Sequence, residues 1–188
     1  MDNALYEQFE ANPVIAAIKD DSGLDQVLSS DISIVFILYG DILNICHIVE
    51  KLKNAGKTTF VHVDLVSGFG PREIIVDYIK KETKADGIIS TRSGMIRRAK
   101  ELGMCGILRI FMIDSMALES VVRQQTASGA DIVEVLPGVL PKVISWIVKT
   151  GKTPVIAGGL LRDKEDVVEA LKAGAIAVST TNTKIWFI

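Results

Sequence analysis

The chain has 188 residues, of which 48% are hydrophobic and 23% charged, and its formal net charge is −2. That length is enough to bury one sizeable core, and the composition is typical of an ordinary globular domain. The charge excludes a strong global field for nucleic acid or an anionic membrane, and no apolar run reaches the roughly 18 residues that a membrane-spanning helix needs.

The chain begins with a polar stretch, residues 1–12, which we expect to form a short helix or a loose cap. No basic segment precedes an apolar one there, so no secretory signal is visible. The two cysteines, Cys46 and Cys105, form no CxxC pair. This pattern predicts reduced thiols, no metal staple and a cytoplasmic location.

Short apolar runs alternate with helical patterns along the rest of the chain. Strands are predicted within residues 13–18, 33–38, 59–64, 87–90, 106–111, 131–136, 153–160 and 175–182. Helices are predicted over about 24–28, 41–54, 71–83, 93–102, 114–127, 139–148 and 163–172. Asp41 is expected to cap the second of these helices, and Pro71 suits the first turn of the third.

Strict alternation of strands and helices predicts a parallel sheet with helices outside it. Eight such units favour a closed α/β barrel, a small TIM-like (β/α)8 barrel in one domain over residues 1–188, rather than an open sheet. No GxGxxG follows the first strand, which disfavours a dinucleotide-binding fold. The last helix would be truncated. The apolar end, 185–188, is expected across the barrel bottom, in the helix gap or in a homo-oligomer interface.

The last two predicted strands end in small and hydroxyl residues. Gly158 and Gly159 allow the backbone to approach a ligand, because glycine has no side chain in the way. Ser179 and Thr180 add hydroxyl and backbone donors. The pattern predicts a phosphate-binding cradle, which many barrels place after strands 7 and 8. Two strand-to-loop turns without a ligand are the alternative.

Ionisable residues interrupt three otherwise apolar strands. His62 and Asp64 share a face of strand 59–64, near the carboxyl end where barrel sites lie, and by the same alternation Arg109 and Glu134 point inward. Charged groups inside a barrel are costly unless they are paired or used. We interpret the four as a ligand site, with a buried network that only fixes the strands as the alternative.

Other polar residues give weaker indications. His62 and Asp64 could begin a metal site, but no third ligand stands at a helpful spacing, and we predict neither a metal nor a cofactor. Arg92, at the same mouth, could pair with a phosphate or carboxylate or lie exposed. No strand carries an inward lysine, which disfavours Schiff-base chemistry. Basic residues cluster within 51–57 and 97–100, and we interpret both clusters as solvated helix faces rather than a readable RNA-binding surface.

Six motifs occur in a fixed order. They are HVDLVSG at 62–68, ADGIISTRS at 85–93, VLPGVLPK at 135–142, AGGL at 157–160, DKEDV at 163–167 and STTN at 179–182, with Trp186 after them. In these motifs the chain resembles the glycerol uptake operon antiterminator family, the glycerol-3-phosphate-responsive regulators of bacterial glycerol genes. The resemblance runs over nearly the full chain.

The resemblance implies a non-enzymatic, TIM-barrel-like protein that binds glycerol 3-phosphate and acts on an mRNA leader, so that transcription passes a terminator. By position, the phosphate would be held by Gly158, Gly159, Ser179 and Thr180. The polyol end, placed mainly by strand alternation, would be lined by His62, Asp64, Arg92, Arg109 and Glu134. One alternative is a barrel enzyme on a small phosphorylated polyol or sugar, with His62, Asp64 and Glu134 as acid and base. Another is a phosphate-binding protein with neither activity.

Overall fold

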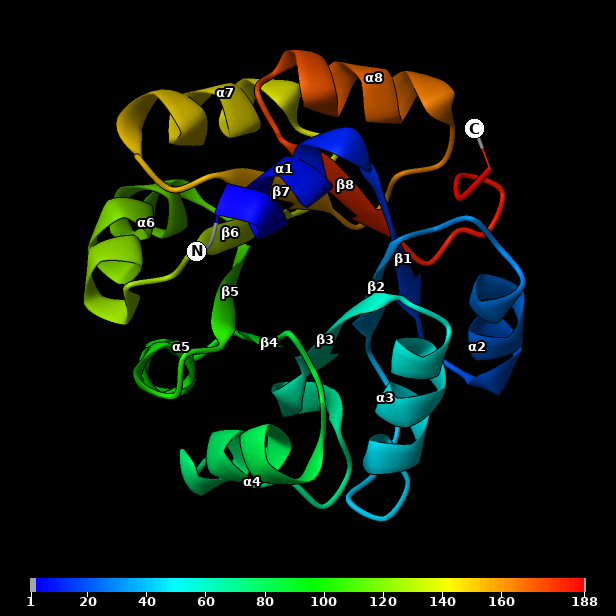
Figure 1. Cartoon of the computed structure of the whole chain (residues 1–188). Helices are drawn as coiled ribbons and strands as arrows, with labels where there is room; N and C mark the ends of the chain where they lie inside the picture. Colours follow the sequence, from blue (N-terminus) through cyan, green and yellow to red (C-terminus); the bar gives the residue numbers. More distant parts are fainter. Residues whose placement is uncertain (1–2, 188) are drawn as a thin grey trace.

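The computed structural model describes residues 3–187. Eight parallel strands close into a barrel in sequence order, with β8 pairing back onto β1. The strands are β1 Val14–Ile18, β2 Ile34–Ile37, β3 Thr58–His62, β4 Gly87–Ser90, β5 Cys105–Phe111, β6 Ile132–Leu136, β7 Val155–Gly158 and β8 Ala177–Thr180. The helices are α1 Asn3–Ala11, α2 Asp21–Leu28, α3 Ile45–Asn54, α4 Ile74–Glu82, α5 Ser93–Glu101, α6 Ser115–Ser128, α7 Pro141–Thr150 and α8 Lys164–Lys172. Figure 1 shows helices ringed around the strands, so the predicted TIM-like barrel is confirmed.

Alternation along each strand divides the core into two layers. Inward residues such as Phe36, Phe60 and Ile107 fill the barrel, and the rings of Phe36 and Phe60 meet edge to face at 5.5 Å between centroids. Outward residues such as Val35 and Val61 pack under the helices. The interior is therefore closed by side chains at its middle, and a ligand has room only at the ends.

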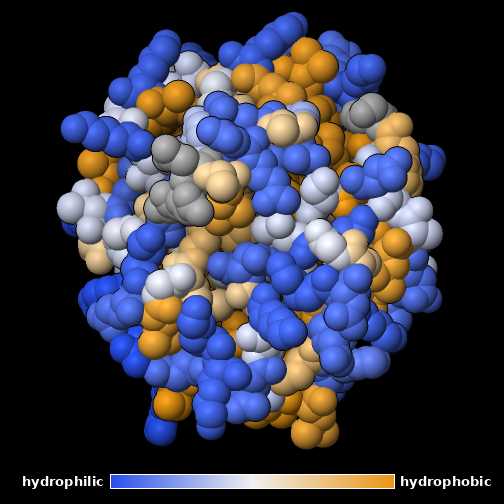
Figure 2. Space-filling model, in the orientation of Figure 1, coloured by the Kyte–Doolittle hydropathy of each residue, from blue (hydrophilic) through white to orange (hydrophobic). Residues whose placement is uncertain are grey.

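Helix α1 covers the amino-terminal end of the barrel. Its Phe9 is fully buried, with a ring centroid 5.7 Å from that of Phe60. Figure 1 looks onto this end, with α1 lying across the strands, and Figure 2 shows that the same face is covered largely by hydrophilic residues. The polar opening stretch thus forms a plug, and the carboxyl ends of the strands remain as the open mouth.

The chain after β8 forms turns where the barrel would have its last helix. Ile185 and Trp186 are buried in the outer core, and the indole Nε1 of Trp186 donates to the Thr180 carbonyl at 2.9 Å. Figure 1 places this segment between α8 and α2, which is the helix gap. Phe187 remains 66% exposed, and Ile188 lies outside the described residues. Among the helices of residues 3–187, none is long and apolar enough to cross a membrane.

Several predicted boundaries are wrong by a few residues, each for a local reason. Strand β3 stops at His62, because Val63–Leu65 form a 3-10 turn. Helix α3 starts at Ile45, because the Asp41 carboxylate caps the preceding turn by accepting from the backbone N–H groups of Leu43 and Asn44. Pro71 lies in the turn before α4, and α2 already starts at Asp21.

Candidate functional site

A cavity of about 360 Å3 opens at the carboxyl ends of the last four strands. Its volume lies at the small end of the range for ligand pockets, about 300–1,000 Å3. Its wall combines charged residues from the barrel interior with two loops that follow β7 and β8. The residues that line it include Arg109, Glu134 and Leu136, residues 159–162 and residues 179–182.

The floor of the cavity is an ion pair between neighbouring strands. Arg109 of β5 and Glu134 of β6 are register partners, and the Arg109 Nε donates to Glu134 Oε2 at 2.6 Å. The side chains are 8% and 0% exposed, so neither charge is screened by bulk water. The two Nη groups of Arg109 have no partner within residues 3–187. The guanidinium therefore offers free donors to anything that enters the cavity.

Glu134 is held from the other side by β8. The Ser179 hydroxyl donates to Glu134 Oε1 at 2.5 Å. This contact requires a glycine on β7 between them, because a Cβ at Gly158 would lie 2.6 Å from Ser179 Oγ and 2.8 Å from Glu134 Oε1. The space beside Gly158 is thus taken by the protein. We expected the Ser179 hydroxyl to donate to a ligand, but its proton is committed to the glutamate.

The loop after β7 forms the outer wall. Gly159 has a φ of +76°, and Leu160 follows it with a φ of 62°. A bulky residue rarely adopts this left-handed conformation, and such strain gathers at binding sites. The loop is braced by Arg162, whose carbonyl accepts from Asn182 Nδ2 at 3.1 Å. The two loops that would form the cradle are therefore tied to each other.

Thr180 completes the junction between the two loops. Its hydroxyl accepts the backbone N–H of Asn182 at 3.1 Å, so its own proton is free to be donated. Its carbonyl holds Trp186 of the terminal segment. Gly159, Ser179 and Thr180 thus all lie on the cavity wall, whereas Gly158 lies behind it.

Asp64 is the centre of a separate cluster at the mouth. Its carboxylate accepts from the Ser90 hydroxyl at 3.0 Å, from the Thr91 backbone at 2.7 Å and from Arg92 Nη1 at 3.3 Å. These bonds tie the turn after β3 to the loop after β4, which explains why the chain leaves the strand at His62. Arg92 is half exposed and does not line the cavity.

His62 is buried between the Arg109–Glu134 ion pair and the Asp64 cluster. Its side chain is 3% exposed, and its Nδ1 lies 4.0 Å from Asp64 Oδ2, too far for a hydrogen bond. Within the described chain this Nδ1 has no hydrogen-bond partner. Burial, followed by the nearby Arg109 guanidinium, lowers the pKa of His62 to about 4. The imidazole is therefore neutral at pH 7. It does not line the cavity.

The structure thus splits the predicted polyol site. Arg109 and Glu134 lie together on the cavity floor, whereas His62, Asp64 and Arg92 form a neighbouring group. Arg162 and Asn182 lie on the wall although the sequence analysis assigned them no role. The only signal for Arg162 was its position just after the Gly-Gly turn. Within residues 3–187, no three His, Cys, Asp or Glu side chains gather in a way that could hold a metal ion.

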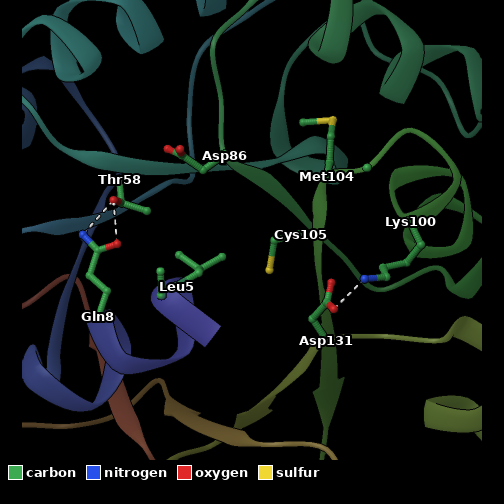
Figure 3. A pocket seen from close by; sticks show the side chains of 10 residues that line it. Leu5, Gln8, Thr58, Asp86, Lys100, Met104, Cys105 and Asp131 are labelled. Atoms are coloured by element: carbon green, nitrogen blue, oxygen red, sulfur yellow. Dashed lines mark hydrogen bonds and ion pairs between the residues drawn. The ribbon is translucent and has the colours of Figure 1, made fainter. Parts of the chain in front are cut away.

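A second cavity, of about 430 Å3, lies at the opposite end of the barrel beside α1 (Figure 3). Its carboxylates have structural partners. Asp86 accepts from Lys53 Nζ at 2.7 Å and from the Thr59 backbone at 2.8 Å. Asp131 accepts from Lys100 Nζ at 2.5 Å and from the Gly106 backbone at 3.0 Å. These brackets tie helices to strand starts, as expected of the stabilising face of a barrel.

Comparison with known proteins identifies the family. The family model described as "glycerol-3-phosphate responsive antiterminator" matches residues 14–186. An uncharacterised Escherichia coli K12 protein, YgcP, is 44% identical over 97% of this chain and 95% of its own.

Solved structures indicate the same family. A glycerol uptake operon antiterminator regulatory protein from Listeria monocytogenes is 33% identical with a TM-score of 0.90, covering 93% of this chain and 94% of its own. An antiterminator-related protein from Thermotoga maritima is 37% identical with a TM-score of 0.84, covering 94% and 99%. A deoxyribose phosphate aldolase from Aeropyrum pernix, 15% identical over 100% of this chain and 97% of its own with a TM-score of 0.74, shares the fold. The chain therefore belongs to the glycerol-3-phosphate responsive antiterminator family.

Proposed function

We propose that the chain is a sensor of glycerol 3-phosphate that regulates glycerol uptake genes in the cytoplasm by acting on the leader of their mRNA. The family description names the phosphoester, and two relatives of known structure are named as glycerol uptake operon antiterminator proteins. The observation that carries the proposal is the cavity at the ends of β5–β8, on whose floor the two Nη groups of Arg109 have no partner within residues 3–187.

The phosphate is assigned to the loops after β7 and β8. Gly159 lets the ligand approach the main chain, and Thr180 has a hydroxyl proton to donate. Arg162 supplies a cation on the same wall, with no ion pair of its own inside residues 3–187. Hydrogen bonds from charged donors to phosphate are roughly twice as strong as neutral ones. Ser179 and Gly158 act from behind by holding Glu134 in place.

The glycerol end is assigned to the cavity floor. Hydroxyl groups both donate and accept, so they match a floor that offers Arg109 Nη donors beside the Glu134 carboxylate. His62, Asp64 and Arg92 support this floor from the side. Because the imidazole is neutral, it adds no second positive charge beside Arg109. A ligand with a phosphate and two hydroxyls would satisfy both parts of the cavity.

The braces between loops offer a way to convert binding into regulation. Asn182 ties the β8 loop to Arg162, and the backbone N–H of Gly138 donates to the Gly159 carbonyl at 3.0 Å. A ligand that holds Gly159 and Thr180 together favours the braced arrangement of these loops. It changes the equilibrium only as far as it binds this arrangement better than the open one.

An enzyme on a phosphorylated sugar is the less favoured function. The aldolase relative shares only the fold, and no described strand carries a lysine for Schiff-base formation. Of the three candidates for acid and base, His62 and Asp64 do not line the cavity, and Glu134, which does, is held in an ion pair with Arg109.

Transcription in vitro through the leader of a glycerol uptake operon from the organism that encodes this chain tests the function. We expect read-through of the terminator to rise when the protein and sn-glycerol 3-phosphate are added together. Glycerol or inorganic phosphate in place of the phosphoester should have no effect. Read-through that is the same with and without sn-glycerol 3-phosphate would overturn the proposal.

A further inference from the structure

A groove of about 500 Å3 runs between α6 and α7 on the outside of the barrel. Figure 1 shows these two helices as neighbours, on the side of the barrel opposite α2. The α6 side contributes Leu118 and Val122, and the α7 side contributes Trp146 and Lys149. Trp146 is 43% exposed and Val122 is 45% exposed, so the groove presents an aromatic ring and an aliphatic edge to solvent.

Cations flank this ring. Lys142, Trp146 and Lys149 follow the i, i+4, i+7 spacing that places side chains on one face of a helix. The Nζ of Lys142 lies 5.2 Å from the centroid of the Trp146 ring. Neither lysine forms an ion pair within residues 3–187. Glu119 of α6, on the facing wall, is the carboxylate among the residues that line the groove.

The basic cluster on α5 is neutralised. On α5, Arg97 pairs with Glu73 at 3.3 Å, Arg98 with Asp77 at 2.5 Å, and Lys100 with Asp131. On α3, Lys53 pairs with Asp86 at 2.7 Å. The α5 cluster therefore offers little charge to a polyanion, whereas the α7 lysines keep theirs; on α3, Lys51 remains exposed.

We propose that Lys142, Trp146 and Lys149 form a docking platform for single-stranded RNA, on which a base stacks against the indole while the lysines contact flanking phosphates. Nonspecific single-strand binders combine these two features, an aromatic ring and cations that follow the backbone. This inference rests on the proposed function for the class of its partner.

The platform is connected to the ligand cavity by one short loop. Gly138, three residues before α7, donates to Gly159 on the cavity wall. A Cβ at Gly138 would lie 2.9 Å from the backbone nitrogen of Gly158, so the loop packs directly on the main chain of the cradle. A shift of the Gly159 loop on ligand binding would therefore act directly on the loop that leads into α7, whose first turn contains Lys142.

Fluorescence anisotropy with a labelled uridine RNA of roughly 12 nucleotides, in saturating sn-glycerol 3-phosphate, tests the platform. Trp146→Ala should weaken binding by about 5- to 150-fold, and Trp146→Phe should retain most of it. Lys142→Gln and Lys149→Gln should each lower the salt dependence of log K by about 0.7 per lost phosphate contact. The matched control is Lys51→Gln, an exposed lysine on α3, which should behave as wild type.

Two results would overturn the platform. One is RNA affinity that is absent in the wild-type protein, or that is unchanged in Trp146→Ala. The other is a fall in sedimentation mass in Trp146→Ala, which would make the groove an interface between copies of the chain. Calorimetry with sn-glycerol 3-phosphate separates these results from failure of the proposed function, because the Trp146 variants should bind the phosphoester like wild type. Wild-type protein that binds no phosphoester would refute the sensor, whatever the RNA result.

Discussion

Replacing Gly158 is predicted to cost less when Ser179 is shortened with it. The φ of Gly158 lies outside the left-handed region, so alanine meets no backbone strain, and the only obstacle is space. An added Cβ would lie 2.6 Å from Ser179 Oγ, whereas ordinary contact begins near 3.4 Å. The Ser179 hydroxyl must move away, and its hydrogen bond to Glu134 is then lost.

The expected free energies follow from these contacts. Loss of a hydrogen bond to a charged acceptor costs about 1.5–3 kcal/mol, and overpacking adds about 1–3 kcal/mol. Replacing glycine by alanine lowers the conformational entropy of the unfolded chain, which stabilises the folded protein by about 0.4–1 kcal/mol. Gly158→Ala should therefore lower the free energy of unfolding by about 2–5 kcal/mol, and Ser179→Ala by about 1.5–3 kcal/mol. In the double variant the hydrogen bond is lost only once and the nearest atom is gone, although the added Cβ still lies 2.8 Å from Glu134 Oε1.

Urea denaturation of the four proteins measures this coupling, with the m value checked for constancy. The double variant should be more stable than the sum of the single effects predicts, by about 1.5–3 kcal/mol. Additivity within about 0.5 kcal/mol would refute the reasoning, because it would mean that Gly158 and Ser179 do not share the space beside Glu134.

Three further predictions concern the buried polar groups. Because an unfolded histidine takes up a proton near pH 6.5 and His62 only near pH 4, its contribution to stability is full above pH 6.5 and declines below it. Between pH 7 and pH 5 the wild-type protein should lose about 2 kcal/mol in urea denaturation that His62→Gln does not lose, while the exposed His47→Gln should behave as wild type. Glu134→Gln leaves the Arg109 guanidinium buried without a counterion and should cost about 3–5 kcal/mol, much of which Arg109→Met/Glu134→Met should regain; equal stability of the two variants would argue against a buried pair. Cys105 is 7% exposed and burial raises its pKa, so iodoacetamide should label it only after unfolding, as mass spectrometry would show; rapid labelling of the native protein at pH 8 would contradict this.

The barrel itself was predictable because its strands are short buried runs with glycine or proline near their ends. Inward placement of Arg109 and Glu134 also followed from alternation, and it is confirmed because Ile107 and Ile132, two residues before them, lie in the barrel interior. The prediction that Asp64 belongs to the strand is wrong: β3 ends at His62, and Asp64 lies in the 3-10 turn after it, held by hydrogen bonds from the distant loop after β4. No local pattern carries that information.

The cavity wall was less predictable than its floor. Arg162 lies in a loop, where no periodicity indicates which way a side chain points. Ser179 could have been placed inward by its spacing from Ala177, yet its partner, Glu134, is 45 residues away in the chain. The destination of α1 at the barrel end likewise depends on contacts such as that of Phe9 with Phe60, which the sequence alone does not order.

Calorimetric titration of the purified chain with sn-glycerol 3-phosphate tests the central claim most directly, with glycerol and inorganic phosphate as controls. Gly159→Asp places a carboxylate on the cavity wall, whereas Gly56→Asp makes the same change at a φ of +74° with nothing within 4 Å. We predict saturable heat for wild type and Gly56→Asp, and binding at least about tenfold weaker in Gly159→Asp, because two negative charges about 4 Å apart repel strongly. Absence of binding in wild type, or equal affinity in all three proteins, would contradict the account.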